Sequence, residues 1–259
     1  MTAKEIFNYL IEKSFYQQEN TCDSIFIGNP ETDVKKVAVC FKLTAELIQK
    51  AIEGGYGMII AHEPTFSTGN YPNPDMIIDV KKWEMLSKSG IVVCHMHDCI
   101  HNYKFDYIHA GFLKELGLQV AYQYERDFFG ACRYKLEEPT TVLEIARLIE
   151  QKIGVEFLRC VGDPDVNVET LGLGLGNVGL QHANILINPG CDLFITGEIG
   201  EVFVCSYIND ACYFGEKKAM LVLGHCSSEY AGMRLLAKDL NKNLVAADYL
   251  HCGEVYCKI

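Results

Sequence analysis

The stretch GMIIAHEP, residues 57–64, is a short apolar run that ends in a histidine, an acid and a proline. Two later stretches have the same form, GIVVCHMHDCIH at 90–101 and AMLVLGHCSSE at 219–229. A short apolar run that is closed by polar residues is typical of a buried strand in a parallel sheet. We therefore expect each of the three to be a strand that presents polar side chains at its carboxyl end.

Helical patterns alternate with these strands. In the first half of the chain they lie at 3–18, 44–54, 76–89 and 107–117, and residues 20–35 are rich in turn signals. They return at 140–154, 180–189, 201–212 and 230–240, with further strands such as DLFITGE at 192–198. This rhythm predicts an α/β fold of two packed lobes with largely parallel sheets, the N-terminal lobe at 1–125, the C-terminal lobe at 126–259, and terminal elements that intertwine.

The composition is that of a globular, acidic protein. Of 259 residues, 49% are hydrophobic and 22% are charged, and the formal net charge is −11. This excludes a disordered chain and argues against nucleic-acid binding, which needs an excess of Lys and Arg. No apolar run is long enough for a membrane span, and the first residues do not resemble a signal peptide. The 12 cysteines include no CxxC pair, which predicts buried thiols in the reducing cytoplasm.

Five of the eight histidines lie in the three opening stretches. In parallel α/β folds, binding sites form at the carboxyl ends of the strands, where segments distant in sequence converge. Imidazole and carboxylate groups are the ligands that zinc, iron and manganese prefer. The sequence therefore predicts a metal site at these strand ends, whose candidate groups are His62, Glu63, His95, His97, Asp98, His101, His225 and Glu229.

Neighbouring polar residues have roles that the sequence leaves open. Asp98 is either an additional ligand or a partner that orients a histidine, and His95 is equally undecided. A fourth strand end carries Thr196 and Glu198, which we expect to line a substrate pocket.

Two other signals point to different chemistry. Residues 174–179 contain a GxGxxG pattern, but the helix expected after it is short, and the required acid would fall at Glu198. A tight turn or an anion-binding nest is the better interpretation. The other alternative is a thiol nucleophile, because Cys94, Cys99 and Cys226 lie beside histidines. A Cys–His pair needs only one histidine, and the strand ends carry five, so metal chemistry is the better interpretation.

The order and spacing of these motifs resemble the Nif-three-like family of hexameric proteins with a dinuclear metal centre, also named GTP cyclohydrolase 1 type 2 homologs. The matching motifs are IIAHEPTF at 59–66, VCHMHDCIH at 93–101, ITGE at 195–198 and GHCSSE at 224–229. The resemblance covers nearly the whole chain. It implies a metal site at the strand ends between two α/β lobes, and assembly as a homohexamer.

The chain departs from the family pattern at two ligands. By motif match, His62, His97, His225 and Glu229 stand where the family has ligands. Glu63 stands where the family usually has a second histidine, and His101 where it usually has an aspartate. Both changes exchange one ligand type for another, so six candidate ligands remain.

The resemblance implies a metal-dependent hydrolase that acts on a nucleotide or phosphoester-like small molecule. Two divalent ions per subunit, of zinc, iron or manganese, are expected as cofactors. Glu229 is expected to bridge the ions, and Glu63 is either a ligand or a general base, so both are candidate catalytic residues. The competing hypothesis is a non-enzymatic role in metal storage or delivery, or as a scaffold for partner proteins.

Overall fold

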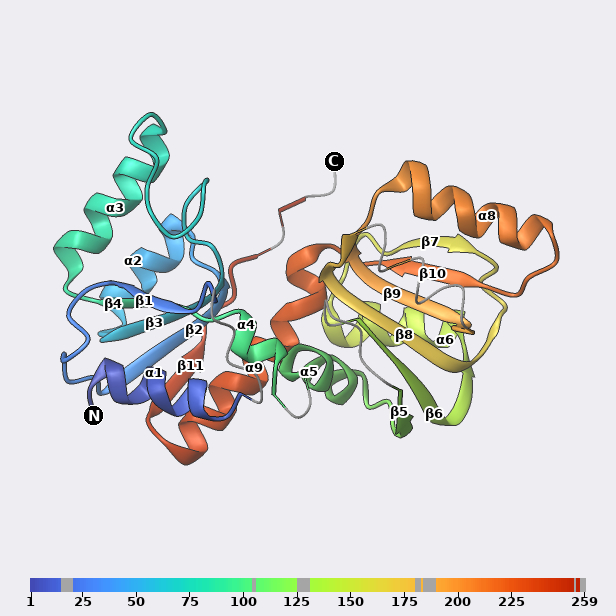
Figure 1. Cartoon of the computed structure of the whole chain (residues 1–259), viewed down its shortest axis with the longest axis horizontal. Helices are drawn as coiled ribbons and strands as arrows, with labels where there is room; N and C mark the ends of the chain where they lie inside the picture. The colour runs from blue at the N-terminus through green and yellow to red at the C-terminus, as the bar shows by residue number, and fades with distance from the viewer. Residues whose placement is uncertain are drawn as a thin grey trace. The chain divides into compact units, whose positions relative to one another are not determined.

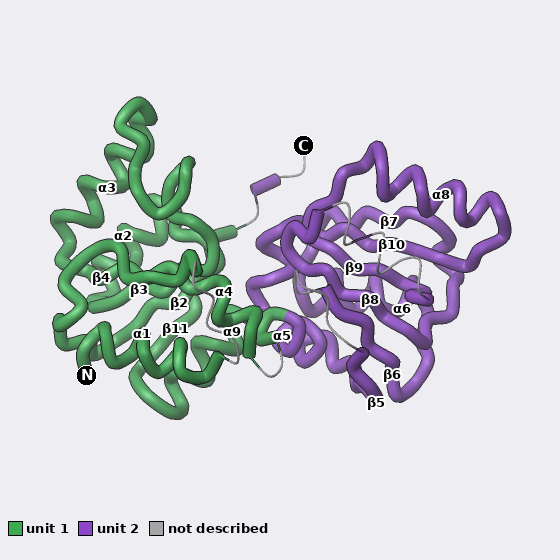
Figure 2. The backbone as a smooth tube through the Cα atoms, viewed as in Figure 1, with its two compact units in different colours: residues 1–108, 232–253 green, residues 109–231, 254–259 purple. Residues whose placement is uncertain are grey.

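The computed structural model of this chain describes residues 1–14, 21–103, 106–124, 131–179, 183, 190–253 and 255–256. The chain forms two compact units (Figure 2): unit 1 comprises 1–108 and 232–253, and unit 2 comprises 109–231 and 254–259. The chain passes from unit 1 to unit 2 inside helix α5 (Tyr107–Leu116) and returns inside helix α9 (His225–Asn243). The sequence analysis placed this division at 125/126. A crossing inside a continuous helix leaves no turn signal, so the sequence does not reveal it.

Unit 1 contains a five-stranded sheet with helices on both faces (Figure 1). In spatial order the strands are β1 (Ser24–Ile27), β4 (Val92–His95), β3 (Met58–Glu63), β2 (Lys36–Lys42) and β11 (Ala246–Tyr249). Neighbouring strands are parallel except for β1 and β4. The described helices are α1 (Ala3–Glu12), α2 (Ala45–Glu53), α3 (Ile77–Ser89), the single turn α4 (Asp98–His101) and the later part of α9.

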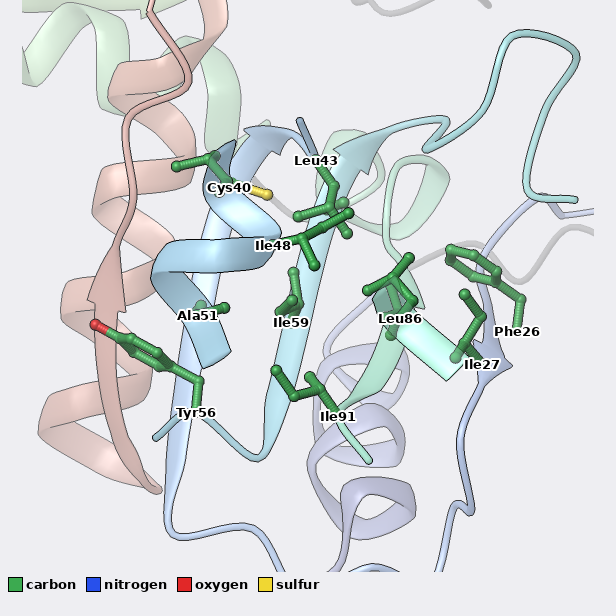
Figure 3. Packing of buried hydrophobic residues seen from close by; sticks show 14 of the residues in the cluster. Phe26, Ile27, Cys40, Leu43, Ile48, Ala51, Tyr56, Ile59, Leu86 and Ile91 are labelled. Atoms are coloured by element: carbon green, nitrogen blue, oxygen red, sulfur yellow. The ribbon is translucent and has the colours of Figure 1, made fainter. Parts of the chain in front are cut away.

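The core of unit 1 forms because its central strands are buried on both faces. Residues 37–41 of β2 and 58–62 of β3 are all buried, as expected of parallel strands that are covered on two sides. On one face, Ile48 of α2 and Leu86 of α3 belong to the same apolar cluster as Ile59 of β3 (Figure 3). This packing holds the carboxyl ends of β3 and β4 in place.

Unit 2 contains a six-stranded mixed sheet. In spatial order its strands are β5 (Val120–Gln123), β6 (Cys132–Thr141), β8 (Asn167–Asn177), β9 (Leu193–Glu198), β10 (Ala219–Val222) and β7 (Arg159–Gly162). The central strands β8, β9 and β10 are parallel, and the outer pairings are antiparallel. The described helical segments are most of α5, α6 (Val142–Leu148), α8 (Ser206–Tyr213), the start of α9, and the π-helical turns η1 (Ile149–Ile153) and η2 (Glu201–Cys205).

The α/β class predicted from the sequence is confirmed. Parallel pairing dominates unit 1 but only the centre of unit 2. The link from β5 to β6 is too short for the crossover that parallel strands need, so these two strands pair antiparallel. Strand β1 lies inside 20–35, which turn signals had suggested to be a loop. The predicted helix 3–18 is α1, which ends at Glu12, while 15–20 lie outside the described residues, as does 180–189 apart from Ala183.

Among the helices that the structure describes, none is both long enough and apolar enough to cross a membrane.

Candidate metal centre

Three histidines of unit 1 meet where β3 and β4 end. His62 is the penultimate residue of β3, His97 follows β4, and His101 ends the short helix α4. Because β3 and β4 are parallel neighbours, their carboxyl ends lie at the same edge of the sheet. One potential ligand atom from each histidine lies within 4.8 Å of those of the other two. The fold thus brings His62 together with a second segment of the sequence, which carries both His97 and His101.

The three rings pack around His62. The His62 ring stacks on the His97 ring with centroids 4.6 Å apart, and its centroid is 5.1 Å from that of His101. The His97 and His101 centroids are 4.9 Å apart. His62 is fully buried, whereas the side chains of His97 and His101 are 35% and 19% exposed. The group therefore has a buried base and a side that an ion can reach from solvent.

Each of these imidazoles has a hydrogen-bond acceptor at its Nδ1 atom. The acceptors are the Met96 carbonyl for His62 (3.1 Å), the Asp98 carboxylate for His97 (3.1 Å) and the Asp106 carboxylate for His101 (2.9 Å). An acceptor at Nδ1 assigns the proton of a neutral imidazole to that atom and leaves a lone pair on Nε2. Metal-binding histidines in proteins are oriented by such contacts.

Two carboxylates border the histidine group. Glu63 places Oε1 3.9 Å from Nε2 of His97, and its side chain is 19% exposed. The hydrogen bond from His97, followed by that from the Thr21 hydroxyl, holds the pKa of Asp98 well below its usual range. Asp98 is therefore ionised at neutral pH and orients His97, which is one of the two roles that the sequence left open.

His95 lies at the end of β4, behind the group. It is 3% exposed, and its ring centroid is 6.3 Å from that of His97. Its Nδ1 atom lies 2.8 Å from the Asn70 amide nitrogen and 3.1 Å from the Cys22 carbonyl oxygen. Burial, followed by the neighbouring His97, lowers the pKa of His95. His95 is consequently neutral at pH 7 and belongs to the packing around the histidine group.

Two buried aspartates that support the group are absent from the sequence-based candidates. Asp106 pairs with His101 and accepts a 2.8 Å hydrogen bond from the backbone N–H of Ile108. Asp23 is 6% exposed and accepts hydrogen bonds from the backbone N–H groups of His97, Asp98 and Cys99. The only signal for Asp106 is an acid just before a helix, which is also typical of an ordinary helix cap.

In unit 2, His225 and Glu229 lie one turn apart at the start of α9. Oε2 of Glu229 is 3.4 Å from Nε2 of His225. Glu198, the last residue of β9, places Oε1 3.0 Å from Nδ1 of His225. Glu229 is 2% exposed, whereas the side chain of Glu198 is 52% exposed. His225 is thus held between a buried and an exposed carboxylate.

Two glycines allow the backbone to approach this pair closely. Gly176 has φ +73°, and a Cβ atom there would overlap the Glu229 carboxylate and lie 3.0 Å from Nε2 of His225. A Cβ atom at Gly197 would lie 2.6 Å from Oγ of Ser228. The Ser228 hydroxyl accepts from the Gly176 N–H at 2.9 Å and donates to the His225 carbonyl at 2.8 Å. Gly174 and Gly176 of the GxGxxG pattern lie in β8, whose register with β9 shifts between Gly174 and Asn177. The close approach to His225 is therefore made by an irregular strand end and not by the turn that the sequence predicted.

Thr196 has a supporting place at this strand end. It is fully buried, and its hydroxyl donates a 3.2 Å hydrogen bond to the backbone carbonyl of Glu198. The contact fixes the backbone conformation from which the Glu198 side chain reaches His225.

A cavity of about 610 Å³ opens in unit 2 beside the start of α9. Its wall includes Gly224 and Ser227, the residues on either side of the His225–Cys226 pair. Arg159 supplies a cation and is 2.9 Å from Glu201, in a pair whose members are both largely exposed. Such a pair contributes little to stability, so the guanidinium can exchange partners. The remaining lining residues are Gly154, Val155, Glu156, Phe157, Leu223 and Tyr256.

The donors of the histidine group suit a divalent transition-metal ion. Imidazole nitrogens bind zinc and iron well, and neutral imidazole is the form that coordinates. The Nδ1 contacts described above orient the three rings, and their potential ligand atoms already lie within 4.8 Å of one another. The residues of unit 1 therefore fit a metal ion.

The fold and this site define an α/β protein with a histidine-rich group that can hold a metal ion at its strand ends. Residues 1–252 match the family described as Duf34/NIF3 (NGG1p interacting factor 3), and the chain belongs to that family.

The chain is similar to curated proteins named GTP cyclohydrolase 1 type 2 homolog. The protein of that name from Clostridium perfringens is 25% identical over 226 residues, which are 85% of this chain and 83% of the relative. The corresponding protein from Clostridium acetobutylicum is 24% identical over 225 residues, 83% of this chain and 80% of the relative.

Solved structures share the fold. The protein ybgI, described as of unknown function, superposes with a TM-score of 0.79 at 19% identity, covering 99% of this chain and 100% of its own. TTHA1606 from Thermus thermophilus has a TM-score of 0.74 at 21% identity, with coverage of 99% and 100%. A Bacillus cereus protein related to NIF3 has a TM-score of 0.74 at 15% identity, with coverage of 100% and 99%.

Replacing Asp106 by Asn is expected to weaken metal binding by about 10- to 100-fold. The amide places an NH₂ group or a weaker acceptor against Nδ1 of His101, so the orientation of that imidazole is lost. Competition with a chromogenic chelator measures the affinity. Asp239→Asn is the matched control, because Asp239 bonds Lys13 and Tyr107 rather than a histidine. Equal affinities for the two variants would show that Asp106 only caps a helix.

Proposed function

We propose that this protein is a metal-dependent hydrolase that holds two divalent ions per chain and acts on a nucleotide or a related phosphoester. The observation that carries the proposal is the group of three histidines in unit 1, each with an acceptor at Nδ1 that directs its lone pair to Nε2. The names of the curated relatives and the motif order support the choice of substrate class.

The proposed ligands come from both sets of strand ends. We assign zinc, iron or manganese as the metals, because imidazole nitrogens favour these ions over magnesium. When bound, the ions would supply Lewis-acid chemistry to the substrate. Glu229 is proposed as the shared ligand, and the full set is His62, Glu63, His97, His101, His225 and Glu229.

The residues around the proposed ligands orient them and hold protons. Asp98 and Asp106 keep the Nδ1 protons of His97 and His101 in place. Glu198 does the same for His225 from the exposed side. Because these three carboxylates orient three different rings, each ligand nitrogen is fixed before an ion arrives, which reduces the entropy lost on binding.

The cavity of unit 2 is proposed as the substrate site. Arg159 would bind a phosphate, while Phe157 and Tyr256 offer aromatic surface for a base. Gly224 and Ser227 connect this wall directly to His225. Thr196 and Glu198, at the end of β9, were expected to line the pocket but are not among the residues that line this cavity. We propose that they act on the substrate site through His225, Glu198 by its carboxylate and Thr196 by its hydrogen bond to the Glu198 backbone.

A substitution separates the two roles open to Glu63. If Glu63 is a ligand, Glu63→Gln lowers metal content and turnover together, because an amide is a weaker ligand than a carboxylate. If Glu63 is a general base, the metal remains and turnover falls by about 10²- to 10⁴-fold. Elemental analysis and an activity assay on the same sample distinguish the roles, with Glu84→Gln on the exposed side of α3 as control. If neither quantity changes, Glu63 is neither a ligand nor a general base.

The test of the proposed function begins with metal content. The purified protein, reconstituted with zinc, manganese or iron, is expected to carry two ions per chain that a chelator removes. The loaded protein is then screened against nucleotides and phosphoesters beside Glu229→Gln. Absence of metal after all three reconstitutions would overturn the metal centre. Two bound ions without turnover of any substrate would overturn the hydrolase and favour metal storage or delivery.

We further propose that the protein acts in the cytoplasm as a homohexamer, as the family resemblance implies. Reduced thiols support a reducing compartment: 11 of the 12 cysteines lie among the described residues, and none of these 11 is in a disulfide. Light scattering during size-exclusion chromatography gives the mass of the assembly, and a mass other than six chains would contradict the hexamer.

A further inference from the structure

The loop that precedes β1 is tied firmly to the histidine group. The buried carboxylate of Asp23 accepts the backbone N–H groups of three consecutive residues, at 2.5 Å from His97, 3.0 Å from Asp98 and 2.7 Å from Cys99. These bonds fix the start of α4 and residues 21–23 against each other. The neighbouring Cys22 is consequently held in one position relative to His97.

Two further contacts orient Cys22 itself. Its backbone N–H and the Thr21 hydroxyl both donate to Oδ2 of Asp98, at 3.2 Å and 2.9 Å. Its carbonyl oxygen lies 3.1 Å from Nδ1 of His95. With this backbone, the Cys22 sulfur, a ring nitrogen of His97 and a carboxylate oxygen of Asp98 all lie within 4.8 Å of one another.

A thiolate, an imidazole and a carboxylate form a ligand set that selects soft and borderline ions. Around tetrahedral zinc, with metal–ligand distances of about 2.0–2.3 Å, neighbouring ligand atoms are separated by roughly 3.5 Å. The three ligand atoms, which lie within 4.8 Å of one another, are already near that separation. Sulfur excludes magnesium and favours zinc, cobalt and cadmium.

We propose that Cys22, together with His97 and Asp98, binds a thiophilic divalent ion at the outer side of the histidine group. The inference rests on the proposed metal centre, because the ion is the one that His97 binds there: with its Nδ1 atom bonded to Asp98, His97 has a single lone pair, on Nε2. It adds a sulfur ligand that neither the sequence motifs nor the named relatives indicate. Its consequence is specificity: the centre discriminates zinc and cobalt from magnesium more strongly than histidines and carboxylates alone would allow.

The chain supplies a matched control for this thiol. Cys22 and Cys160 are the two exposed cysteines among the 11 that the structure describes. Cys160 lies on β7 and belongs to none of the candidate metal-binding groups among the described residues. Cys22→Ser and Cys160→Ser therefore remove an accessible thiol with and without the neighbouring ligands.

Cobalt titration of the full chain tests whether sulfur binds the ion. We expect a thiolate-to-cobalt charge-transfer band in the near ultraviolet that disappears in Cys22→Ser and persists in Cys160→Ser. A band that survives Cys22→Ser would assign the sulfur to another cysteine and overturn the proposal. A band that persists in Glu229→Gln supports it, because Glu229 is not part of this ligand set.

Alkylation provides a second readout that does not depend on a spectrum. With saturating zinc, we expect iodoacetamide to modify Cys22 at least tenfold more slowly, by peptide mass spectrometry, while Cys160 is unaffected. Asp98→Asn should weaken this protection. If elemental analysis shows bound zinc but Cys22 reacts at its zinc-free rate, the inference is wrong and the proposed metal centre stands. If no zinc binds, both are overturned.

Discussion

Glu229→Gln is expected to lower hydrolytic activity by at least about 100-fold and to reduce the metal content. Glu229 is 2% exposed, and its carboxylate lies 3.4 Å from Nε2 of His225. Glutamine has nearly the same shape but lacks the negative charge that a divalent ion requires. Loss of a residue that only orients a ligand already costs about 10- to 100-fold, so loss of a shared ligand should cost more. Elemental analysis and turnover on the same preparation measure both effects.

The control for this prediction is Glu216→Gln, which makes the same chemical change at an exposed site in unit 2. Circular dichroism and a thermal melt establish that both variants are folded. Full metal content with unchanged turnover in Glu229→Gln would remove Glu229 from the centre. Retained metal with lost turnover would make it a residue that acts on the substrate.

Gly176→Ala is expected to destabilise unit 2 by about 1–3 kcal/mol from backbone strain, with a steric cost in addition. The backbone at Gly176 has φ +73°, which residues other than glycine rarely adopt. The new methyl group would also overlap the Glu229 carboxylate and press against His225. Thermal denaturation should therefore show a lower midpoint, and metal affinity should fall because the same methyl displaces Glu229.

Gly215→Ala isolates the steric part of this effect. Gly215 lies in the same unit with φ +91°, and a Cβ atom there would meet no other atom within 4 Å. Its substitution costs backbone strain alone and leaves metal affinity unchanged. If Gly176→Ala and Gly215→Ala shift the melting midpoint equally, the added methyl group at residue 176 does not clash with Glu229 or His225.

The sequence predicted the strands that carry the histidines because their signals are local. Short apolar runs that end in polar residues mark β3 and β4 in unit 1 and β10 in unit 2. Parallel pairing of β3 with β4 brings the ends of those two strands to one edge of the unit 1 sheet. The convergence of His62 with His97 follows from that rule. The same reasoning reached Asp98 but left two roles open, since only geometry shows that its carboxylate faces Nδ1 of His97.

The residues that sequence reasoning missed act across long distances in the chain. Asp23 accepts hydrogen bonds from residues more than 70 positions away. The residues next to Asp23 in the sequence carry no signal that predicts this contact. Strand β1 was also missed. It has only four residues, and the turn-forming residues on both sides of it made the whole segment read as a loop. The crossing points inside α5 and α9 were missed because helical periodicity continues through them unchanged.

Those crossing points set an order for folding during synthesis. Most of unit 2 is one continuous segment, residues 109–231, which leaves the ribosome before the last strand of unit 1 has been made. Unit 1 must wait for β11, which pairs with β2 more than 200 residues earlier in the chain. Until β11 has been made, the backbone groups on one edge of β2 have no partner strand, and its apolar side chains are incompletely covered. Exposed edges of this kind are prone to aggregate and are protected by chaperones. Unit 1, whose residues are mostly synthesised first, is therefore the unit that finishes folding last.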